Sequence, residues 1–170
     1  MAVSSPFKVK VHDIMHRPGQ MRESEVDITL TEVMGDGAMT IPVGGVIETD
    51  LRLESVHEGI LATGEVFTTA VGECSRCLDE LKLPVEVDFQ ELFAYSGTEE
   101  DDFTVSDEQI DLEPVIRDAI VLSLPFQPVC SQDCLGLCPE CGLKLAENPN
   151  HAHEQQVDSR WTELAKFKEE

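Results

Sequence analysis

Apolar and polar residues alternate along most of the first hundred positions, which is the period-two pattern of half-buried β-strands. Residues 12–24 interrupt this pattern with His, Pro and Gly and are predicted to form a loop. Short turns rich in Gly and Pro separate the other alternating stretches, as in consecutive antiparallel strands. A glycine inside one stretch, Gly64, predicts a bulge or a tight bend there. The predicted strands are residues 7–11, 25–33, 46–56, 60–74 and 83–93.

A different periodicity follows at residues 111–124, where apolar residues recur at the spacing of one helical stripe. Asp111 is predicted to cap this helix, and Pro125 to end it. The acidic stretch before it, residues 97–108, is predicted to be a surface loop with almost nothing to bury. The pattern therefore predicts an α+β fold, mainly an antiparallel sheet or a small open barrel covered by one helix. The stripe comprises Leu112, Val115, Ile116, Ala119 and Ile120.

The chain changes character after residue 125. Residues 126–151 contain four Cys and three Pro and little regular apolar periodicity, so this segment would need a metal or a partner to fold. Residues 152–170 form a tail in which Trp161, Leu164, Ala165 and Phe167 predict a short amphipathic helix. We therefore divide the chain into a β-rich domain (1–125), a Cys-rich segment (126–151) and this tail.

Composition and charge narrow the function classes. The 170 residues are 41% apolar but only 5% aromatic, which predicts a core of aliphatic side chains. No apolar run approaches the roughly 18 residues of a membrane span, so no membrane association is expected. The first ten residues lack the apolar core of a secretory signal, and we expect a cytoplasmic protein.

The net charge of −22 disfavours binding to nucleic acid, which depends on basic side chains. The charge is uneven along the chain. Residues 1–22 contain four basic side chains and one acidic, a net charge of +3. The other 148 residues contain eight basic and 33 acidic side chains, a net charge of −25. Such an acidic body is either a solvated surface that keeps the protein in solution or a binding surface for a basic protein partner.

The cysteines are the most informative chemical feature. Without a secretory signal, pairs with C-x-x-C spacing favour metal binding in a reducing compartment over disulfides. The sequence C-P-E-C-G, ending at Gly142, is typical of a zinc knuckle, in which backbone N–H groups point at the sulfurs. A site with four thiolates leaves no open position for a substrate, so we expect structural zinc. The candidate ligands are Cys74, Cys77, Cys130, Cys134, Cys138 and Cys141.

Six cysteines exceed one tetrahedral site, and three groupings stay open. The first joins Cys74 and Cys77 to Cys138 and Cys141, and the second is a local site of the last four cysteines. In the third, Cys74 and Cys77 join Cys130 and Cys134, and the last knuckle is completed by His151 or His153. Cysteines that are buried or redox-active, without any metal, are the alternative to all three.

Four blocks of sequence, in this order, resemble the bacterial YceD family, the large ribosomal RNA subunit accumulation proteins. They are G-E-C-S-R-C-L, D-L-E-P-V-I-R-D-A-I-V-L-S-L-P, C-S-Q-D-C-L-G-L-C-P-E-C-G and D-S-R-W-T-E-L-A-K-F-K. The resemblance covers roughly residues 20–168, and the acidic six-cysteine form looks like the actinobacterial branch. It implies a role in accumulating 23S ribosomal RNA. Because some members lack the C-P-x-C-G knuckle, it also favours Cys74, Cys77, Cys130 and Cys134 as the more general ligand set.

No catalytic motif is present: there is no G-x-S-x-G and no phosphate-binding G-x-x-x-x-G-K-[ST]. We therefore expect a non-enzymatic factor for large-subunit biogenesis that binds a basic ribosomal protein or an assembly factor. One alternative is direct rRNA binding through the basic N-terminal arm with Arg76, Arg160, Lys166 and Lys168. Another is a thiol-redox protein that uses the Cys74/Cys77 pair, with Arg76 lowering a thiol pKa.

Overall fold

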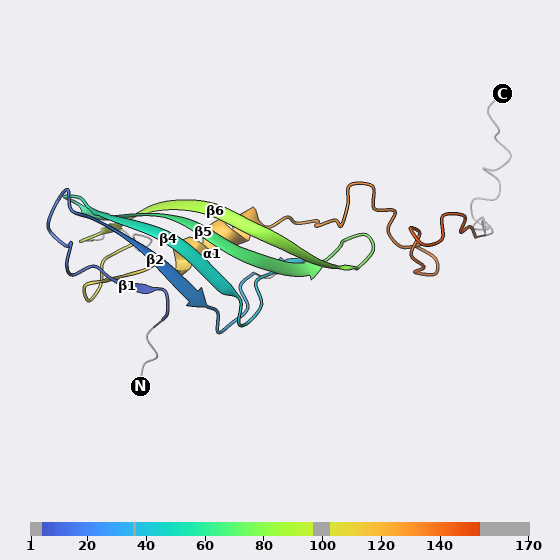
Figure 1. Cartoon of the computed structure of the whole chain (residues 1–170), viewed down its shortest axis with the longest axis horizontal. Helices are drawn as coiled ribbons and strands as arrows, with labels where there is room; N and C mark the ends of the chain where they lie inside the picture. Colours follow the sequence, from blue (N-terminus) through green and yellow to red (C-terminus); the bar gives the residue numbers. More distant parts are fainter. Residues whose placement is uncertain (1–4, 36, 97–102, 154–170) are drawn as a thin grey trace, which may run out of the picture.

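The computed structural model describes residues 5–35, 37–96 and 103–153, and it is mostly antiparallel sheet with one helix (Figure 1). The long strands follow the alternating stretches of the sequence, because alternate side chains enter the core. The five-stranded sheet contains β2 (Met21–Thr29), β3 (Met39–Thr40), β4 (Val46–Ser55), β5 (Gly59–Glu73) and β6 (Glu80–Ala94).

The sheet is built around β5, the central strand. β2 pairs with β4, β4 with β5, and β5 with β6, all antiparallel. The short β3 pairs with β5 where Met39 faces Gly72, beyond the end of the β4–β5 ladder. Within the described residues the sheet does not close into a barrel. The predicted loop at 12–24 was too long, because Met21 already pairs with Glu54.

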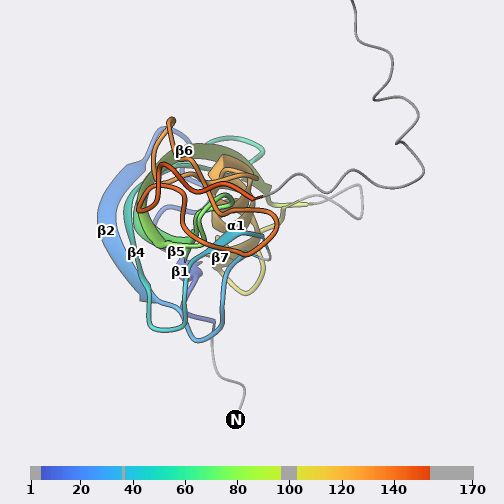
Figure 2. The same ribbon diagram turned by 90° about the vertical axis from the view of Figure 1, so that its right-hand side faces the viewer.

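The predicted helix is present as α1 (Glu113–Ser123), and it lies against one face of the curved sheet (Figure 2). Asp111 does not occupy the cap position, because it lies in β7 (Gln109–Asp111), which pairs with β1 (Lys8–Lys10). Its carboxylate still accepts the Glu113 N–H at 3.0 Å. No helix in the described part of the chain has the length and apolar character needed to cross a membrane.

The core is mainly aliphatic, as the composition predicted, although it also contains phenylalanine and methionine side chains, and it lies between α1 and the inner face of the sheet. Ile116 and Ile120 of α1 are fully buried against this face. Part of the predicted acidic loop also contributes, because Phe103 and Val105 pack against the core. The sheet contributes Ile47, Leu51, Leu53, Ile60, Ala62 and Val66.

Gly64 is neither a bulge nor a bend. It keeps a regular register between Leu51 of β4 and Phe89 of β6. A Cβ at this position would lie 2.5 Å from the Phe89 ring. The glycine therefore allows an aromatic ring to pack closely on the central strand.

The basic N-terminal residues do not form a free arm over the described positions. Phe7, Val11 and Ile14 are buried in the core. Arg22 forms an ion pair with Asp13 at 2.7 Å and donates a hydrogen bond to the Lys10 carbonyl oxygen. The predicted tail helix lies outside the described residues, which end at His153.

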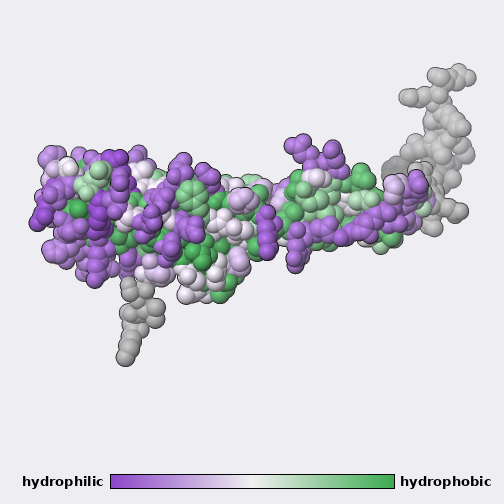
Figure 3. All heavy atoms as spheres, viewed as in Figure 1, coloured by the Kyte–Doolittle hydropathy of each residue, from purple (hydrophilic) through white to green (hydrophobic). Residues whose placement is uncertain are grey.

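The outer face of the sheet, opposite α1, is strongly acidic. Glu25, Asp50, Glu65 and Asp88 lie directly opposite one another in a row across β2, β4, β5 and β6. Hydrophilic residues cover much of the molecule on this side (Figure 3). Arg52 and Lys82 are basic residues on the same face. We call the following residues the acidic sheet face: Glu23, Glu25, Asp27, Glu48, Asp50, Glu54, Glu65, Glu86 and Asp88.

Like charges that face each other across strands destabilise a sheet. Glu65 shows this effect, because desolvation and the charges of Asp88, Glu86 and Asp50 raise the pKa of its carboxyl group. Its ionised form therefore costs folding free energy at neutral pH. This cost declines as the pH falls through the raised pKa and is absent below the ordinary pKa of glutamate.

Replacing Glu65 with Gln should therefore make the protein more stable at pH 7, with a higher denaturant midpoint. The gain should shrink toward zero as the pH is lowered below the ordinary glutamate pKa. Glu23→Gln is the matched control, because Glu23 lies directly opposite the basic Arg52 and not opposite a carboxylate. Equal midpoints for Glu65→Gln and the wild type at pH 7 would contradict this account.

Candidate functional site

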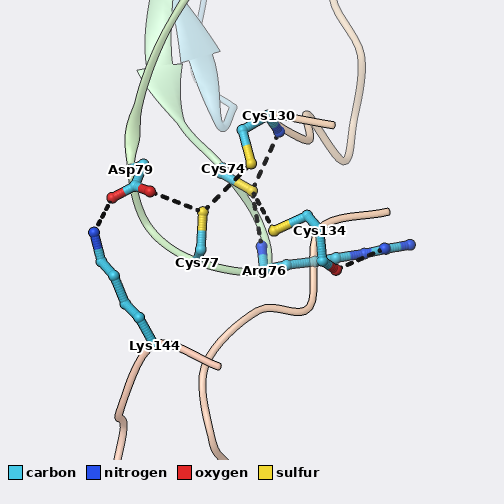
Figure 4. A network of polar contacts seen from close by, with 7 residues as sticks. All are labelled: Cys74, Arg76, Cys77, Asp79, Cys130, Cys134 and Lys144. Carbon is cyan, nitrogen blue, oxygen red and sulfur yellow. Dashed lines mark hydrogen bonds and ion pairs between the residues drawn. The ribbon is translucent and has the colours of Figure 1, made fainter. Parts of the chain in front are cut away.

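Four of the six cysteines meet at the end of the sheet where β5 turns into β6 (Figure 4). Cys74 and Cys77 belong to this turn, and Cys130 and Cys134 come from the segment that follows α1. Their four sulfur atoms all lie within 4.8 Å of one another. This is the third of the groupings that the sequence left open, and we call it the four-cysteine cluster.

The spacing of the sulfurs suits a tetrahedral metal ion. The Cys74 and Cys134 Sγ atoms are 3.9 Å apart, and those of Cys77 and Cys130 are 3.6 Å apart. Four sulfurs at the usual zinc–sulfur distance would be about 3.8 Å apart. The cluster could thus hold a zinc-sized ion with little movement of its ligands. With four protein donors, it would leave no position for a substrate.

Backbone N–H groups surround the Cys74 sulfur. Those of Arg76 and Cys130 each lie 3.4 Å from it. Burial raises the pKa of the Cys74 thiol, but the backbone donors of Cys77, Arg76 and Cys130 outweigh burial and lower the pKa to about 6. Cys74 is therefore disposed to be a thiolate, the form that binds metal.

Cys77 behaves in the opposite way. The Asp79 backbone N–H lowers its pKa, but burial and hydrogen bonds with Cys74, Cys130 and the Asp79 side chain outweigh this and raise it to about 11. Its thiol donates to the Asp79 carboxylate at 3.3 Å. The cluster thus favours one thiolate next to protonated thiols. A bound cation is what would allow all four to ionise.

Polar contacts that do not involve the cysteine sulfurs join the β5–β6 turn to the Cys-rich segment. We call this contact region the junction. The Arg76 guanidinium donates to the carbonyl oxygens of Gln132 and Cys134, both at 3.1 Å, and the Leu137 N–H donates to the Arg76 carbonyl at 3.0 Å. The Arg76 side chain thus contacts the Cys-rich segment, where the sequence suggested a contact with rRNA. Arg76 does lower the pKa of the Cys74 thiol, as expected, but through its backbone N–H.

Two further residues of this junction were not predicted from the sequence. Lys144 forms an ion pair with Asp79 across it. Gly136 has a φ of +75°, and a Cβ there would lie 3.0 Å from the Arg76 carbonyl oxygen. Only the glycine gave a sequence signal, because glycine tolerates both the positive φ and the close approach.

The remaining two cysteines form a second cluster with histidines. Cys138, Cys141, His151 and His153 place one sulfur or nitrogen atom each within 4.8 Å of one another. The C-P-E-C-G turn has the predicted backbone, since the Gly142 N–H donates to the Cys138 carbonyl at 2.8 Å with a φ of +72° at Gly142. The sequence offered the two histidines as alternatives, and the structure brings both into one cluster.

The knuckle also changes the acidity of its first cysteine. The backbone N–H groups of Cys141 and Glu140 lower the pKa of the Cys138 thiol to about 6, against the opposing effect of burial. In each cluster, the first cysteine in the sequence therefore has a lowered thiol pKa, which favours the thiolate form. Each cluster could hold one metal ion.

Removing metal with a chelator should loosen the junction between the two segments but leave the sheet intact. Two hydrogen bonds report on it: Ser75 N–H to the Pro128 carbonyl and Leu137 N–H to the Arg76 carbonyl. Hydrogen exchange measured by mass spectrometry should become faster in peptides spanning 74–79 and 126–144 and stay slow in β4 and β5. A Cys74→Ser, Cys77→Ser variant should exchange fast at the junction with or without chelator. Identical exchange of the wild type in both conditions would count against metal binding there.

Comparison with known proteins gives a consistent family assignment. The chain is 44% identical over 172 residues to the uncharacterized protein Rv2926c of Mycobacterium tuberculosis, covering 97% of this chain and 83% of that protein. It is 38% identical over 167 residues to ML1660 of Mycobacterium leprae, covering 94% and 76% of the two chains. It is 27% identical over 169 residues to YlbN of Bacillus subtilis, covering 95% and 96%.

No solved structure matches the chain. The model of one protein family matches residues 62–168, which include both C-x-x-C pairs, the helix and the Cys-rich segment. Together with the mycobacterial relatives, this match shows that the chain belongs to the YceD family of large ribosomal RNA subunit accumulation proteins.

Proposed function

We propose that this protein promotes accumulation of 23S ribosomal RNA as a non-enzymatic factor whose acidic sheet face holds a basic ribosomal protein or assembly factor. Family membership supports the link to ribosome biogenesis. The acidic sheet face is the observation that supports the kind of partner. It crosses four neighbouring strands of a rigid sheet and is not covered by α1.

The electrostatics of this face favour a basic partner. Its carboxylates make the local electrostatic potential negative and would steer a positively charged protein toward it. A groove of about 540 Å³ on this face is lined by Glu23, Glu25, Asp50 and Arg52, among others. Lysine or arginine side chains placed there would also relieve the repulsion between the opposed carboxylates. Binding and the stability of the sheet would thus be coupled.

Direct binding to rRNA is the competing mechanism. The same face would repel a phosphate backbone, and Arg22, a basic N-terminal residue, is engaged with Asp13. Binding to a basic protein therefore agrees better with the charge distribution.

The four-cysteine cluster would have a structural role in this function. Its donor set fits zinc, which would hold the Cys-rich segment on the β5–β6 turn. The metal would fix the shape of this end of the molecule and take no part in a reaction.

The role of the acidic sheet face can be tested with two variants that remove equal charge. The first is Asp50→Asn, Glu65→Gln, Asp88→Asn. The control is Asp118→Asn, Asp133→Asn, Glu147→Gln, at exposed positions outside that face. The first variant should fold more stably than the wild type because it loses repulsion. Even so, it should retain less of the basic ribosomal protein or assembly factor in pull-downs. It should also fail to restore the ratio of 23S to 16S rRNA in cells that lack the wild-type chain.

The control variant should restore both properties. Full activity of the acidic-face variant would overturn the proposed partner surface, and its greater stability means that failure cannot be ascribed to misfolding. Retention of rRNA by purified protein, weakening steeply as salt rises, would favour direct RNA binding instead.

A further inference from the structure

In the second cluster, two histidine nitrogens and two cysteine sulfurs lie so close together that hydrogen bonds alone do not account for all their contacts. The Nε2 atoms of His151 and His153 are 2.8 Å apart. Each also lies 3.2 Å from a sulfur: His153 from Cys138 and His151 from Cys141. Four atoms that can each donate an electron pair thus point to one centre. Protons can satisfy only some of these contacts, whereas one divalent cation satisfies them all.

A carboxylate outside the cluster fixes one of the rings. The Nδ1 atom of His153 lies 3.2 Å from a carboxylate oxygen of Glu140. When Nδ1 carries the proton, it donates to Glu140, and the lone pair of Nε2 faces the cluster. Histidine ligands of metal sites are commonly oriented by such a carboxylate. Glu140 is the third residue of the C-P-E-C knuckle, so one short turn supplies two thiols and this acceptor.

We propose that Cys138, Cys141, His151 and His153 form a second zinc site, independent of the four-cysteine cluster, with Glu140 as the positioning residue of His153. Two thiolates and two imidazoles are a tetrahedral donor set typical of zinc. The two clusters share no ligand. All four ligands of this site lie within residues 138–153, so it closes a short loop, whereas the four-cysteine cluster joins distant parts of the chain.

The ligand spacing is compatible with this assignment. In a tetrahedral site, the sulfur–nitrogen and nitrogen–nitrogen separations would be about 3.6 and 3.3 Å. The observed distances of 3.2 and 2.8 Å are shorter, so the ligands would move apart by about half an ångström. Cys141 and His153 are exposed, so their side chains have room for this movement.

The two sites should therefore differ in how fast they release metal. The four-cysteine cluster has two buried ligands, Cys74 and Cys77, and one exposed ligand, Cys130, whereas the second site has one buried ligand and two exposed ligands. A chelator therefore reaches the second site more easily. Release should occur in two phases, with the second site emptied first.

Zinc content of the full-length chain tests the assignment directly. The purified wild type should contain two zinc ions per chain, and His151→Ala, His153→Ala should contain one. The fast phase of release to a chelator should be missing from that variant. The Cys74→Ser, Cys77→Ser variant should also contain one ion and keep the fast phase; if it fails to fold, the histidine variant alone decides.

Glu140→Gln tests the positioning role. It should lower zinc affinity at the second site by about 10- to 100-fold and leave the slow phase unchanged. Glu147→Gln, at an exposed position in the same segment, is the matched control and should change neither phase. Equal zinc content in the wild type and the histidine variant would overturn the second site. Unchanged affinity in Glu140→Gln would overturn the role of Glu140 alone.

Discussion

The four-cysteine cluster is the constraint on which the shape of the C-terminal part of the described chain depends. Its contacts join residues separated by 60 and 53 positions in the sequence, Cys74 with Cys134 and Cys77 with Cys130. Between residues 126 and 153 there is no helix or strand, only an isolated bridge from Leu137 to Lys144. Few apolar side chains are buried there. Apolar burial alone therefore does not explain the order of this segment, and a metal bound at the cluster would close a long loop and supply a cross-link.

The sheet is in the opposite situation. It buries many apolar side chains, whereas the carboxylates on its outer face repel one another and oppose folding. Its inner face and α1 bury aliphatic side chains. The free energy gained by this burial offsets the repulsion between carboxylates on the outer face. A row of like charges is a poor choice for stability alone. Its position on the open face, away from the core, is consistent with use in binding. If the proposed function holds, stability and partner recognition would be located on opposite faces of the same strands.

Most of the fold could be predicted from the sequence, because it follows from local periodicity. Alternation located the long strands, and the stripe of Val115, Ile116 and Ile120 located the helix. The errors came from neighbours distant in sequence. Gly64 gave the signal of a bend but accommodates the ring of Phe89, and Asp111 was assigned to a cap although pairing with Lys8 places it in a strand.

The sequence identified the candidate ligands of the site, but it did not determine which of them share one metal ion. Spacing identified the cysteines, yet the choice of partners for Cys74 and Cys77 depends on how the chain returns after α1. The row of carboxylates that face one another on the acidic sheet face likewise depends on strand register. A shift of one strand by one residue would move the side chains of that strand to the other face. Glu140 lay inside the recognised motif, but only the three-dimensional structure shows that it faces His153.

The central claim is that metal binding at the four-cysteine cluster holds the Cys-rich segment against the sheet. Anomalous diffraction from crystals of the protein, recorded on both sides of the zinc absorption edge, tests it most directly. The account predicts an anomalous peak at the centre of the sulfur atoms of Cys74, Cys77, Cys130 and Cys134. Ordered residues 126–137 with no peak there, the four sulfurs being free thiols or paired as disulfides, would contradict it.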